Sequence, residues 1–327
     1  ASNTRLSMVA ATSPHHSGNK KRGNRFSVVP FGAMESRLRE RGVWSAYQNA
    51  IAAVDDATRR GSPPDIERAC DAVRELVTNA GCSLELAATI CAGFFESGKF
   101  GTGLLAVRSS ANVDDPAQMS GCGGHVSVVG VQANSCAAVA EAVAAVWASL
   151  FTPEAVQTRA AAGVAASADA HMAVVVQEMA PAAVSFVLHT GGRIESVKSL
   201  NPGALPDPRL EVELAVGLGE ALARSGSGSR GDPWRVEVDL ATGDATTTAF
   251  GGIGMARVYQ PHLGLRDEAV DYSKQELSLD AEARERLCRR LAAVGAALEA
   301  EFGGPQNVEG CIVGDDVYVF QSRPQPL

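Results

Sequence analysis

Apolar positions along this chain follow two different periods. Spacings typical of amphipathic helices run through 33–60, with a break at Gly42, and through 64–79, 83–97, 135–149, 153–162 and 280–302. Short β-rich runs lie at 104–107, 172–177, 185–190, 209–215, 234–238 and 246–250. We expect 185–190 to neighbour 172–177, and 234–238 to form a hairpin with 246–250. The pattern predicts a mixture of helices and strands.

The C-terminal stretch carries the most informative pattern. An apolar run follows Glu309, residues 314–316 (Gly-Asp-Asp) supply a turn, and 317–320 form a second β-rich run. A hairpin at this place brings Glu309 close to Gln321 and Arg323, although they are far apart in the sequence. Gln321 and Arg323 share one face because side chains alternate along a strand.

These three side chains suit a metal-bridged phosphate chain. A carboxylate can hold a divalent cation, and a guanidinium takes phosphate oxygens in a fork. A surface hairpin with a salt bridge is the alternative, since polar residues are common near turns.

A second group of polar residues follows the buried-type strand 104–107. Arg108 ends that strand, Ser109 and Ser110 come next, and a glycine-rich loop covers 119–124. An arginine and backbone N–H groups placed in this way can hold an anion, and glycines let the backbone lie close to a ligand. The alternative is an ordinary exit from strand to loop.

Six motifs in order resemble the nucleotide-binding domain of the dikinases, a group that includes phosphoenolpyruvate synthase, pyruvate phosphate dikinase and the α-glucan, water dikinases. The resemblance runs from about Pro30 to the C-terminus. It rests on Arg108-Ser-Ser-Ala-Asn-Val-Asp-Asp, Val146-Trp-Ala-Ser-Leu-Phe-Thr, Met172-Ala-Val-Val-Val-Gln-Glu-Met, Ser185-Phe-Val-Leu-His-Thr, Val216-Gly-Leu-Gly-Glu and Gln321-Ser-Arg-Pro-Gln-Pro. Four motifs resemble the glucan branch of the group, and within it they are most similar to phosphoglucan, water dikinase: Trp147-Ala-Ser-Leu, Ser185-Phe-Val-Leu-His-Thr, Asp271-Tyr-Ser-Lys and Val308-Glu-Gly-Cys.

The resemblance implies an α+β fold of the ATP-grasp type, in which ATP lies between two α+β subdomains. We expect a basic flexible tail at 1–25, a first subdomain at 26–176 with a helical insertion and the phosphate loop, and a second at 177–327 with the metal and phosphate hairpin. The tail has five basic and no acidic residues before Glu35, a composition also found in transit peptides.

Individual roles follow from the resemblance alone. It implies that ATP and Mg²⁺ are the cofactors, that Glu309 and Gln321 bind the metal, and that Arg108 and Arg323 contact the phosphates as the catalytic residues. Gly123 and Ser127 match the loop over the phosphates, and Gln177 with Glu178 matches the segment that meets adenine. Weaker candidates for a place near the phosphates are Glu213, Glu220 and His125. We expect Trp147 to belong to the core and His189 to be structural.

Two features of the family pattern are missing. The family has a phosphate-binding lysine well ahead of its Pro-Phe-Gly motif, whereas Lys20 and Lys21 lie close to Pro30. None of the six histidines lies in a Thr-Ser-His motif of the kind that carries the phosphohistidine.

The resemblance therefore implies the ATP-binding, histidine-phosphorylating part of a phosphoglucan, water dikinase. The phosphohistidine domain would lie elsewhere in the same chain, and a starch-like glucan would be the acceptor in the chloroplast. The complete reaction would convert ATP, phosphoglucan and water into AMP, phosphorylated glucan and phosphate. Alternatives are a glucan, water dikinase and a degenerate, non-catalytic ATP-binding module.

The composition of the chain limits which classes of protein are possible. The 327 residues are 46% hydrophobic, enough for one large domain or two subdomains. A net charge of −8 argues against a nucleic-acid partner, and no apolar run has the length of a membrane span. Seven scattered cysteines without a Cys-X-X-Cys pair indicate buried free thiols and no zinc site.

Overall fold

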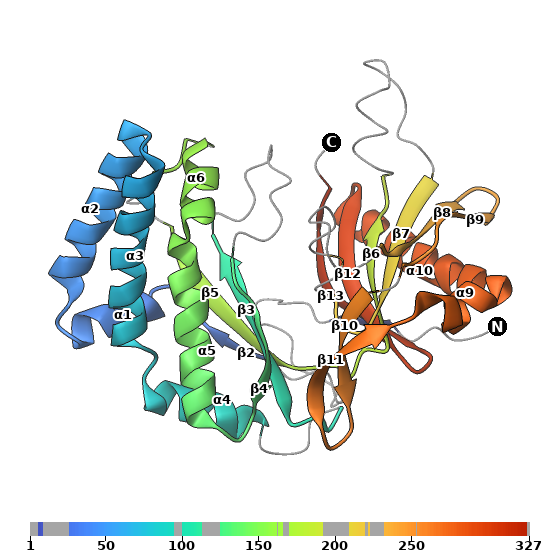
Figure 1. The fold of residues 1–327 in the computed structure, drawn as a ribbon, viewed down its shortest axis with the longest axis horizontal. Coiled ribbons are helices and arrows are strands. Elements are labelled where there is room, and N and C mark those ends of the chain that lie inside the picture. Colours follow the sequence, from blue (N-terminus) through green and yellow to red (C-terminus); the bar gives the residue numbers. More distant parts are fainter. Residues whose placement is uncertain are drawn as a thin grey trace. The chain divides into compact units, whose positions relative to one another are not determined.

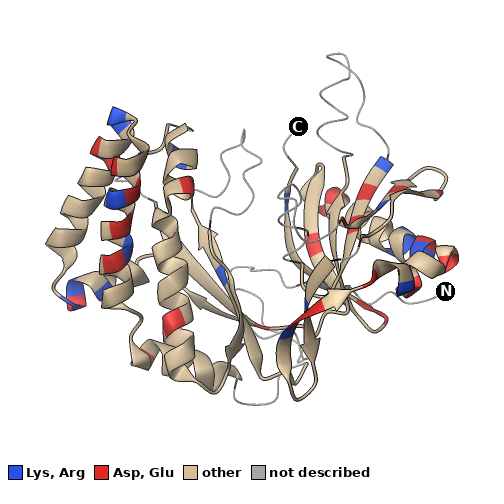
Figure 2. Cartoon of the chain, in the orientation of Figure 1, with Lys and Arg blue, Asp and Glu red and all other residues tan. Residues whose placement is uncertain are grey.

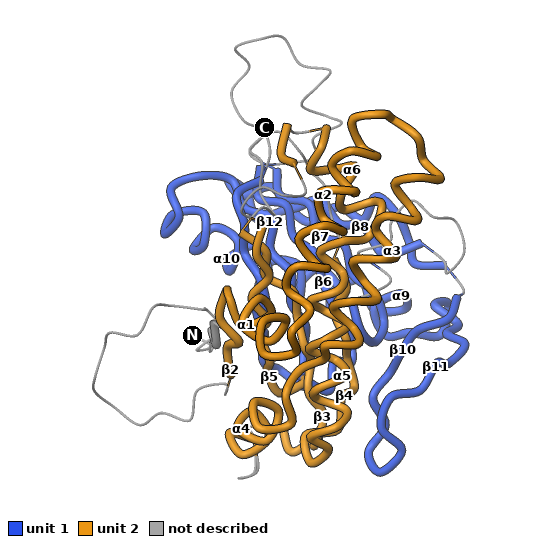
Figure 3. Tube along the Cα trace, turned by 90° about the vertical axis from the view of Figure 1, so that its left-hand side faces the viewer, with its two compact units in different colours: residues 1–21, 180–327 blue, residues 22–179 orange. Residues whose placement is uncertain are grey.

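The structure is a computed structural model that describes residues 6–8, 26–94, 100–112, 125–161, 163–165, 170–191, 209–219, 222, 232–252 and 254–325. The chain divides into two compact units (Figure 3). Unit 2 is Arg22–Met179, and unit 1 combines Ala1–Lys21 with Ala180–Leu327. Each unit contains a sheet and helices, so the predicted α+β class is confirmed.

Unit 2 contains a four-stranded antiparallel sheet in the order β2-β5-β3-β4 (Figure 1). Its strands are β2 (Phe26–Val29), β3 (Leu104–Ala111), β4 (Val128–Gln132) and β5 (Met172–Glu178). Its helices are α1 (Ala33–Glu40), α2 (Trp44–Arg60), α3 (Pro63–Ala80), α4 (Leu84–Phe94), α5 (Cys136–Ala148), the 3₁₀ turn η1 (Ser149–Phe151) and α6 (Pro153–Ala161).

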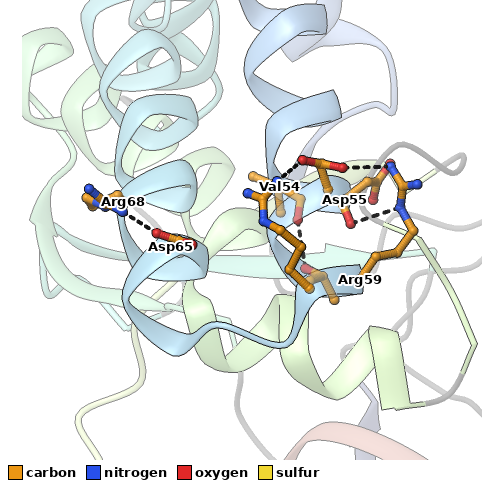
Figure 4. Close-up of polar contacts among 8 residues, drawn as sticks. Val54, Asp55, Arg59, Asp65 and Arg68 are labelled. Atoms are coloured by element: carbon orange, nitrogen blue, oxygen red, sulfur yellow. Dashed lines mark hydrogen bonds and ion pairs between the residues drawn. The ribbon is translucent and has the colours of Figure 1, made fainter.

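Local sequence signals set the ends of these helices. Gly61 ends α2 in the left-handed conformation, and Ser62 precedes the two prolines that begin α3. Ser83 accepts a hydrogen bond from the backbone N–H of Leu86 at 3.1 Å, as predicted for an N-cap, and Ser135 caps α5 in the same way. Acidic and basic residues lie along α2 and α3 (Figure 2), and Asp65 forms an ion pair with Arg68 within α3 (Figure 4).

The two faces of this sheet differ in character. Leu105, Val107, Val174 and Val176 are fully buried and join the hydrophobic core formed with the helices. The opposite face carries Arg108 and Gln177 together with the exposed side chains of β2. We call this second surface the open face of unit 2.

Unit 1 is built around a seven-stranded sheet in the order β1-β13-β12-β6-β7-β8-β9. The strands are β1 (Leu6–Met8), β6 (Val184–His189), β7 (Arg209–Val216), β8 (Trp234–Asp239), β9 (Ala245–Ala249), β12 (Gln306–Val313) and β13 (Asp316–Pro324). A separate two-stranded sheet pairs β10 (Gly254–Gln260) with β11 (Gly264–Val270), and η2 (Tyr272–Lys274), α9 (Glu276–Leu279) and α10 (Ala281–Phe302) follow.

Helix α10 packs against one face of the seven-stranded sheet (Figure 1). Leu291, Val294 and Leu298 meet an apolar surface that includes Leu188 and Leu210. Gly295 allows a close approach, because a Cβ there would lie 2.7 Å from Leu188 Cδ2. The other face of the sheet is free to carry polar residues.

Most predicted helices and strands are present, with one wrong neighbour. The segments 172–177 and 185–190 are both strands, but β5 pairs with β2 and β3, whereas β6 pairs with β7 and β12. Alternation identifies a strand but not its partner, which depends on distant contacts. The hairpin of 234–238 with 246–250 is confirmed as β8 and β9.

Within the stretch predicted as a tail, Leu6–Met8 forms β1, which pairs in parallel with Val317, Tyr318 and Val319 of β13. The helix predicted from Glu220 lies almost entirely outside the described residues. Across the part of the chain that the structure describes, no single helix is long and apolar enough to cross a membrane, although two bent helix pairs pass that test by length and composition.

Candidate functional site

The predicted hairpin exists as β12 and β13, and it brings the predicted residues together. Glu309 lies directly opposite Gln321, and Asn307 lies opposite Arg323. Glu309 and Asn307 are two residues apart in one strand, so all four side chains share a face. This is the face of the seven-stranded sheet that α10 does not cover, and we call it the polar face of unit 1.

A β-bulge aims Gln321 and Arg323 at the polar face. Val319 pairs with Gly310 and Gln321 pairs with Glu309, so Phe320 is an extra residue in β13. In a regular strand, Gln321 and Arg323 would continue the face of Val317 and Val319, which belong to the core under α10. The bulge moves them to the side of Glu309, a device common beside functional sites.

The polar face continues across the neighbouring strands. The row through Glu309 passes Val187, Glu213 and Arg235, and the row through Asn307 passes His189, Glu211 and Glu237, by successive strand pairing. Glu211, Glu213 and Asn307 are buried on this face. Oδ1 of Asn307 has no hydrogen-bond partner within the described part of the chain.

Arg235 and Glu213 form an ion pair on this face. The Nε–H of Arg235 donates to Oε1 of Glu213 at 2.8 Å. This hydrogen bond, together with the nearby acids, raises the pKa of Arg235 above its usual value, so the guanidinium stays charged. Glu213 is therefore already paired in unit 1, a circumstance that favours a structural role for it.

Arg108 and Gln177 come together on the open face of unit 2. Ala106 pairs with Gln177 and Arg108 pairs with Val175, so the two polar side chains lie on the same side of neighbouring strands. Gln177 is buried and Arg108 half-buried. Glu178 follows Gln177 and therefore points to the opposite side of the sheet.

The remaining candidates lie in various places. Ser127 is exposed just before β4, whereas Gly123 and Glu220 lie outside the described residues. His125 Nδ1 is 3.1 Å from the carbonyl oxygen of Ser149. Trp147 is 1% exposed in the core, as predicted, and His189 lies on β6.

Four polar residues of the polar face were not among the residues predicted from the sequence, namely Asn307, Arg235, Glu211 and Glu237. Asn307 could have been found by stepping back two residues from Glu309 along the same strand. Arg235 gave no such signal, because only the pairing of β7 with β8 brings it beside Glu213.

A metal ion would need ligands of other kinds in addition to carboxylate, thiol and imidazole groups. The described residues contain no group of three or more His, Cys, Asp or Glu that could hold one. The opposed Glu309 and Gln321 offer one carboxylate and one amide oxygen. This set fits Mg²⁺, which usually takes few protein ligands and completes its shell with phosphate and water.

Comparison with known proteins identifies the family. Residues 25–327 match the pyruvate phosphate dikinase, AMP/ATP-binding domain. The chain therefore belongs to this family of AMP/ATP-binding domains, whose members include dikinases and other phosphotransferases.

Individual relatives differ in their named activities. Rifampicin phosphotransferase of Streptomyces sviceus is 31% identical over 279 residues, which is 81% of this chain and 28% of the relative. Chloroplastic α-glucan water dikinase of Solanum tuberosum is 29% identical over 178 residues, 47% of this chain and 12% of the relative. A probable phosphoenolpyruvate synthase of Archaeoglobus fulgidus is 29% identical over 225 residues, 67% of this chain and 26% of the relative. The chain thus spans about a quarter of the length of the first relatives that it matches.

Proposed function

We propose that this chain binds ATP with Mg²⁺ and passes a phosphoryl group to a histidine on another domain of the same protein. Units 1 and 2 would be the two ATP-grasp subdomains. The observation that carries the proposal is the bulged hairpin, which gathers Glu309, Gln321 and Arg323 on one polar face.

Each residue has a defined task in this proposal. Glu309 and Gln321 would hold Mg²⁺, which neutralises and orients the phosphate oxygens. Arg323 and Arg108 would bind the phosphates as charged forks. Gln177 would contact the adenine, and Ser127 and Gly123 would belong to the loop that covers the phosphates. Such a site accelerates phosphoryl transfer by positioning and by charge neutralisation.

For the acceptor we propose a phosphorylated, starch-like glucan, so the whole protein would be a phosphoglucan, water dikinase of the plastid. The support is the motif similarity to the glucan branch, in Ser185-Phe-Val-Leu-His-Thr and in Val308-Glu-Gly-Cys. These motifs form β6 and β12, which are neighbours in the seven-stranded sheet. A glucan, water dikinase with an unphosphorylated acceptor is the nearest alternative.

A second candidate is a phosphotransferase that acts on a small molecule. It is favoured by the 31% identity with a rifampicin phosphotransferase over 81% of this chain. The two candidate functions can be distinguished by supplying the full-length protein with ATP labelled in the β-phosphate, in the presence of glucan and of rifampicin. If the acceptor is a glucan, we expect label in phosphorylated glucan and none in rifampicin. Label in rifampicin alone would overturn the glucan proposal.

The nucleotide proposal is tested by calorimetric titration of ATP and Mg²⁺ into this chain. We expect Kd in the micromolar range, and an increase of roughly tenfold or more in Glu309→Gln and in Arg323→Ala, because each removes a charged contact. Glu301→Gln in α10 and Arg266→Ala in β11 are matched controls at exposed positions. A folded chain without ATP binding would leave a degenerate module as the better description.

A further inference from the structure

The end of β5 is tied to the start of β3 by a carboxylate. Oε1 of Glu178 accepts hydrogen bonds from the backbone N–H groups of Phe100 and Gly101, each at 2.9 Å. Two consecutive N–H groups that converge on one carboxylate oxygen form a charge-assisted arrangement, stronger than a bond between neutral groups. We call this arrangement the Glu178 clamp.

Two further contacts place the clamp within a small network. The hydroxyl of Thr102 donates to the carbonyl oxygen of Met179 at 3.1 Å, and the N–H of Met179 donates to the carbonyl of Leu104 at 2.9 Å. Glu178 and Met179 are thus both held against 100–104, Glu178 by its side chain and Met179 by its backbone. Loss of the clamp alone would leave the last two contacts in place, so the fold of unit 2 would survive.

The clamp lies on the side of the sheet away from Gln177. Glu178 pairs with Leu105, a core residue, whereas Gln177 pairs with Ala106 on the open face with Arg108. The carboxylate of Glu178 is therefore directed away from the surface where Arg108 and Gln177 lie. Its second oxygen, Oε2, is buried without a hydrogen-bond partner in the described part of the chain, so nothing else there competes for the carboxylate.

We propose that Glu178 is a positioning residue for base recognition: it fixes the segment 177–179 so that Gln177 meets the nucleotide base in one geometry. This inference rests on the proposed function, because it assumes that ATP binds with its base at Gln177. It assigns Glu178 an indirect task in place of the direct nucleotide contact that the family resemblance implies. A site that recognises a base by hydrogen bonds distinguishes one base from another only when its own polar groups are held rigidly.

The test compares two nucleotides that share the same triphosphate. Kd for ATP and for GTP, each with Mg²⁺, is measured by calorimetry for the unmodified chain, Glu178→Ala, Glu178→Gln and the exposed-site control Glu141→Ala. In the ratio of the GTP Kd to the ATP Kd, the contribution of the shared triphosphate cancels, and so does the effect of any inactive fraction of protein. We expect the unmodified chain and Glu141→Ala to prefer ATP equally, and Glu178→Ala to reduce the preference at least fivefold.

Glu178→Gln keeps one acceptor oxygen and the shape of the side chain, so it should retain most of the preference. It also keeps the test decisive if Glu178→Ala does not fold. A ratio unchanged in both variants, or an equal loss of affinity for both nucleotides, would overturn the positioning role. Absence of ATP binding by the unmodified chain would overturn the proposed function itself, and ATP binding without a preference over GTP would overturn only the inference.

Discussion

Gly310 follows Glu309 directly in β12, and a side chain has no room at this position. A Cβ there would lie 2.2 Å from the carbonyl oxygen of Tyr318 and 2.4 Å from Cζ of Phe186. One neighbour is backbone of the paired strand and the other is a ring in the core, so neither can move cheaply. The glycine in Val308-Glu-Gly-Cys therefore serves the packing that holds Glu309 in place.

We expect Gly310→Ala to lower the free energy of unfolding by about 1–3 kcal/mol, because overpacking in a filled core costs about this much. The measurement is chemical denaturation followed by circular dichroism. Gly304→Ala is the matched control, since a Cβ at Gly304 meets no atom within 4 Å. Equal stability of both variants would show that β12 can shift, contrary to the structure.

Buried thiols give a second prediction at the residue scale. Burial raises the pKa of Cys288 in α10 and of Cys311 in β12 from 9.0 to about 12. The folded protein thus holds these protons more tightly than the unfolded chain does. Their contribution to stability is complete below pH 9 and is lost as the pH rises from 9 towards 12.

Denaturation at several pH values should show this loss. Each thiol contributes a slope of up to about 1.4 kcal/mol per pH unit in that window. Cys288→Ala and Cys311→Ala should each make the alkaline fall less steep and leave the pH dependence below pH 8 unchanged. A fall as steep as in the unmodified chain would mean that these thiols ionise in the folded state at their ordinary pKa.

At the scale of elements, the bulge in β13 decides which side chains share a face. The sequence predicts that Gln321 and Arg323 lie together, and they do, but alternation alone would place them with Val317 and Val319 in the core. A single extra residue, Phe320, reverses this, and nothing in a single sequence marks which residue of a strand is the extra one.

Two deletions test the bulge. Removal of Phe320 leaves Gln321 opposite Glu309 in a regular ladder, so ATP affinity should change by less than about threefold. Removal of Ser322 instead turns Arg323 towards the core beneath α10, so ATP affinity should fall roughly as far as in Arg323→Ala, about tenfold. Both are measured by the same titration. Equal effects of the two deletions would contradict the assigned register.

The elements that were predicted well are those with strong local signals. Asp280 accepts a hydrogen bond from Ala283 N–H and begins α10, and Gly303 ends it in the left-handed conformation. The strands β10 and β11 were not predicted, since their pairing depends on a turn in which His262 has a φ of 68°. The sequence gives little indication that a residue other than glycine will adopt a positive φ.

At the scale of the whole molecule, the sequence grouped the candidate residues by motif and the structure groups them by unit. Glu309, Gln321 and Arg323 lie on the polar face of unit 1, and Arg108 and Gln177 on the open face of unit 2. The sequence predicted the first group from one hairpin. The family resemblance was needed to join the second group to it, because no local pattern links strands so far apart along the chain.

The most direct test of the proposed nucleotide site is a crystal structure of this chain with Mg²⁺ and a non-hydrolysable ATP analogue. We predict that Mg²⁺ is bound by a carboxylate oxygen of Glu309 and the amide oxygen of Gln321, that Arg323 and Arg108 contact phosphate oxygens, and that the base lies beside Gln177. A nucleotide bound away from the polar face of unit 1, or Mg²⁺ held by other residues, would contradict this prediction.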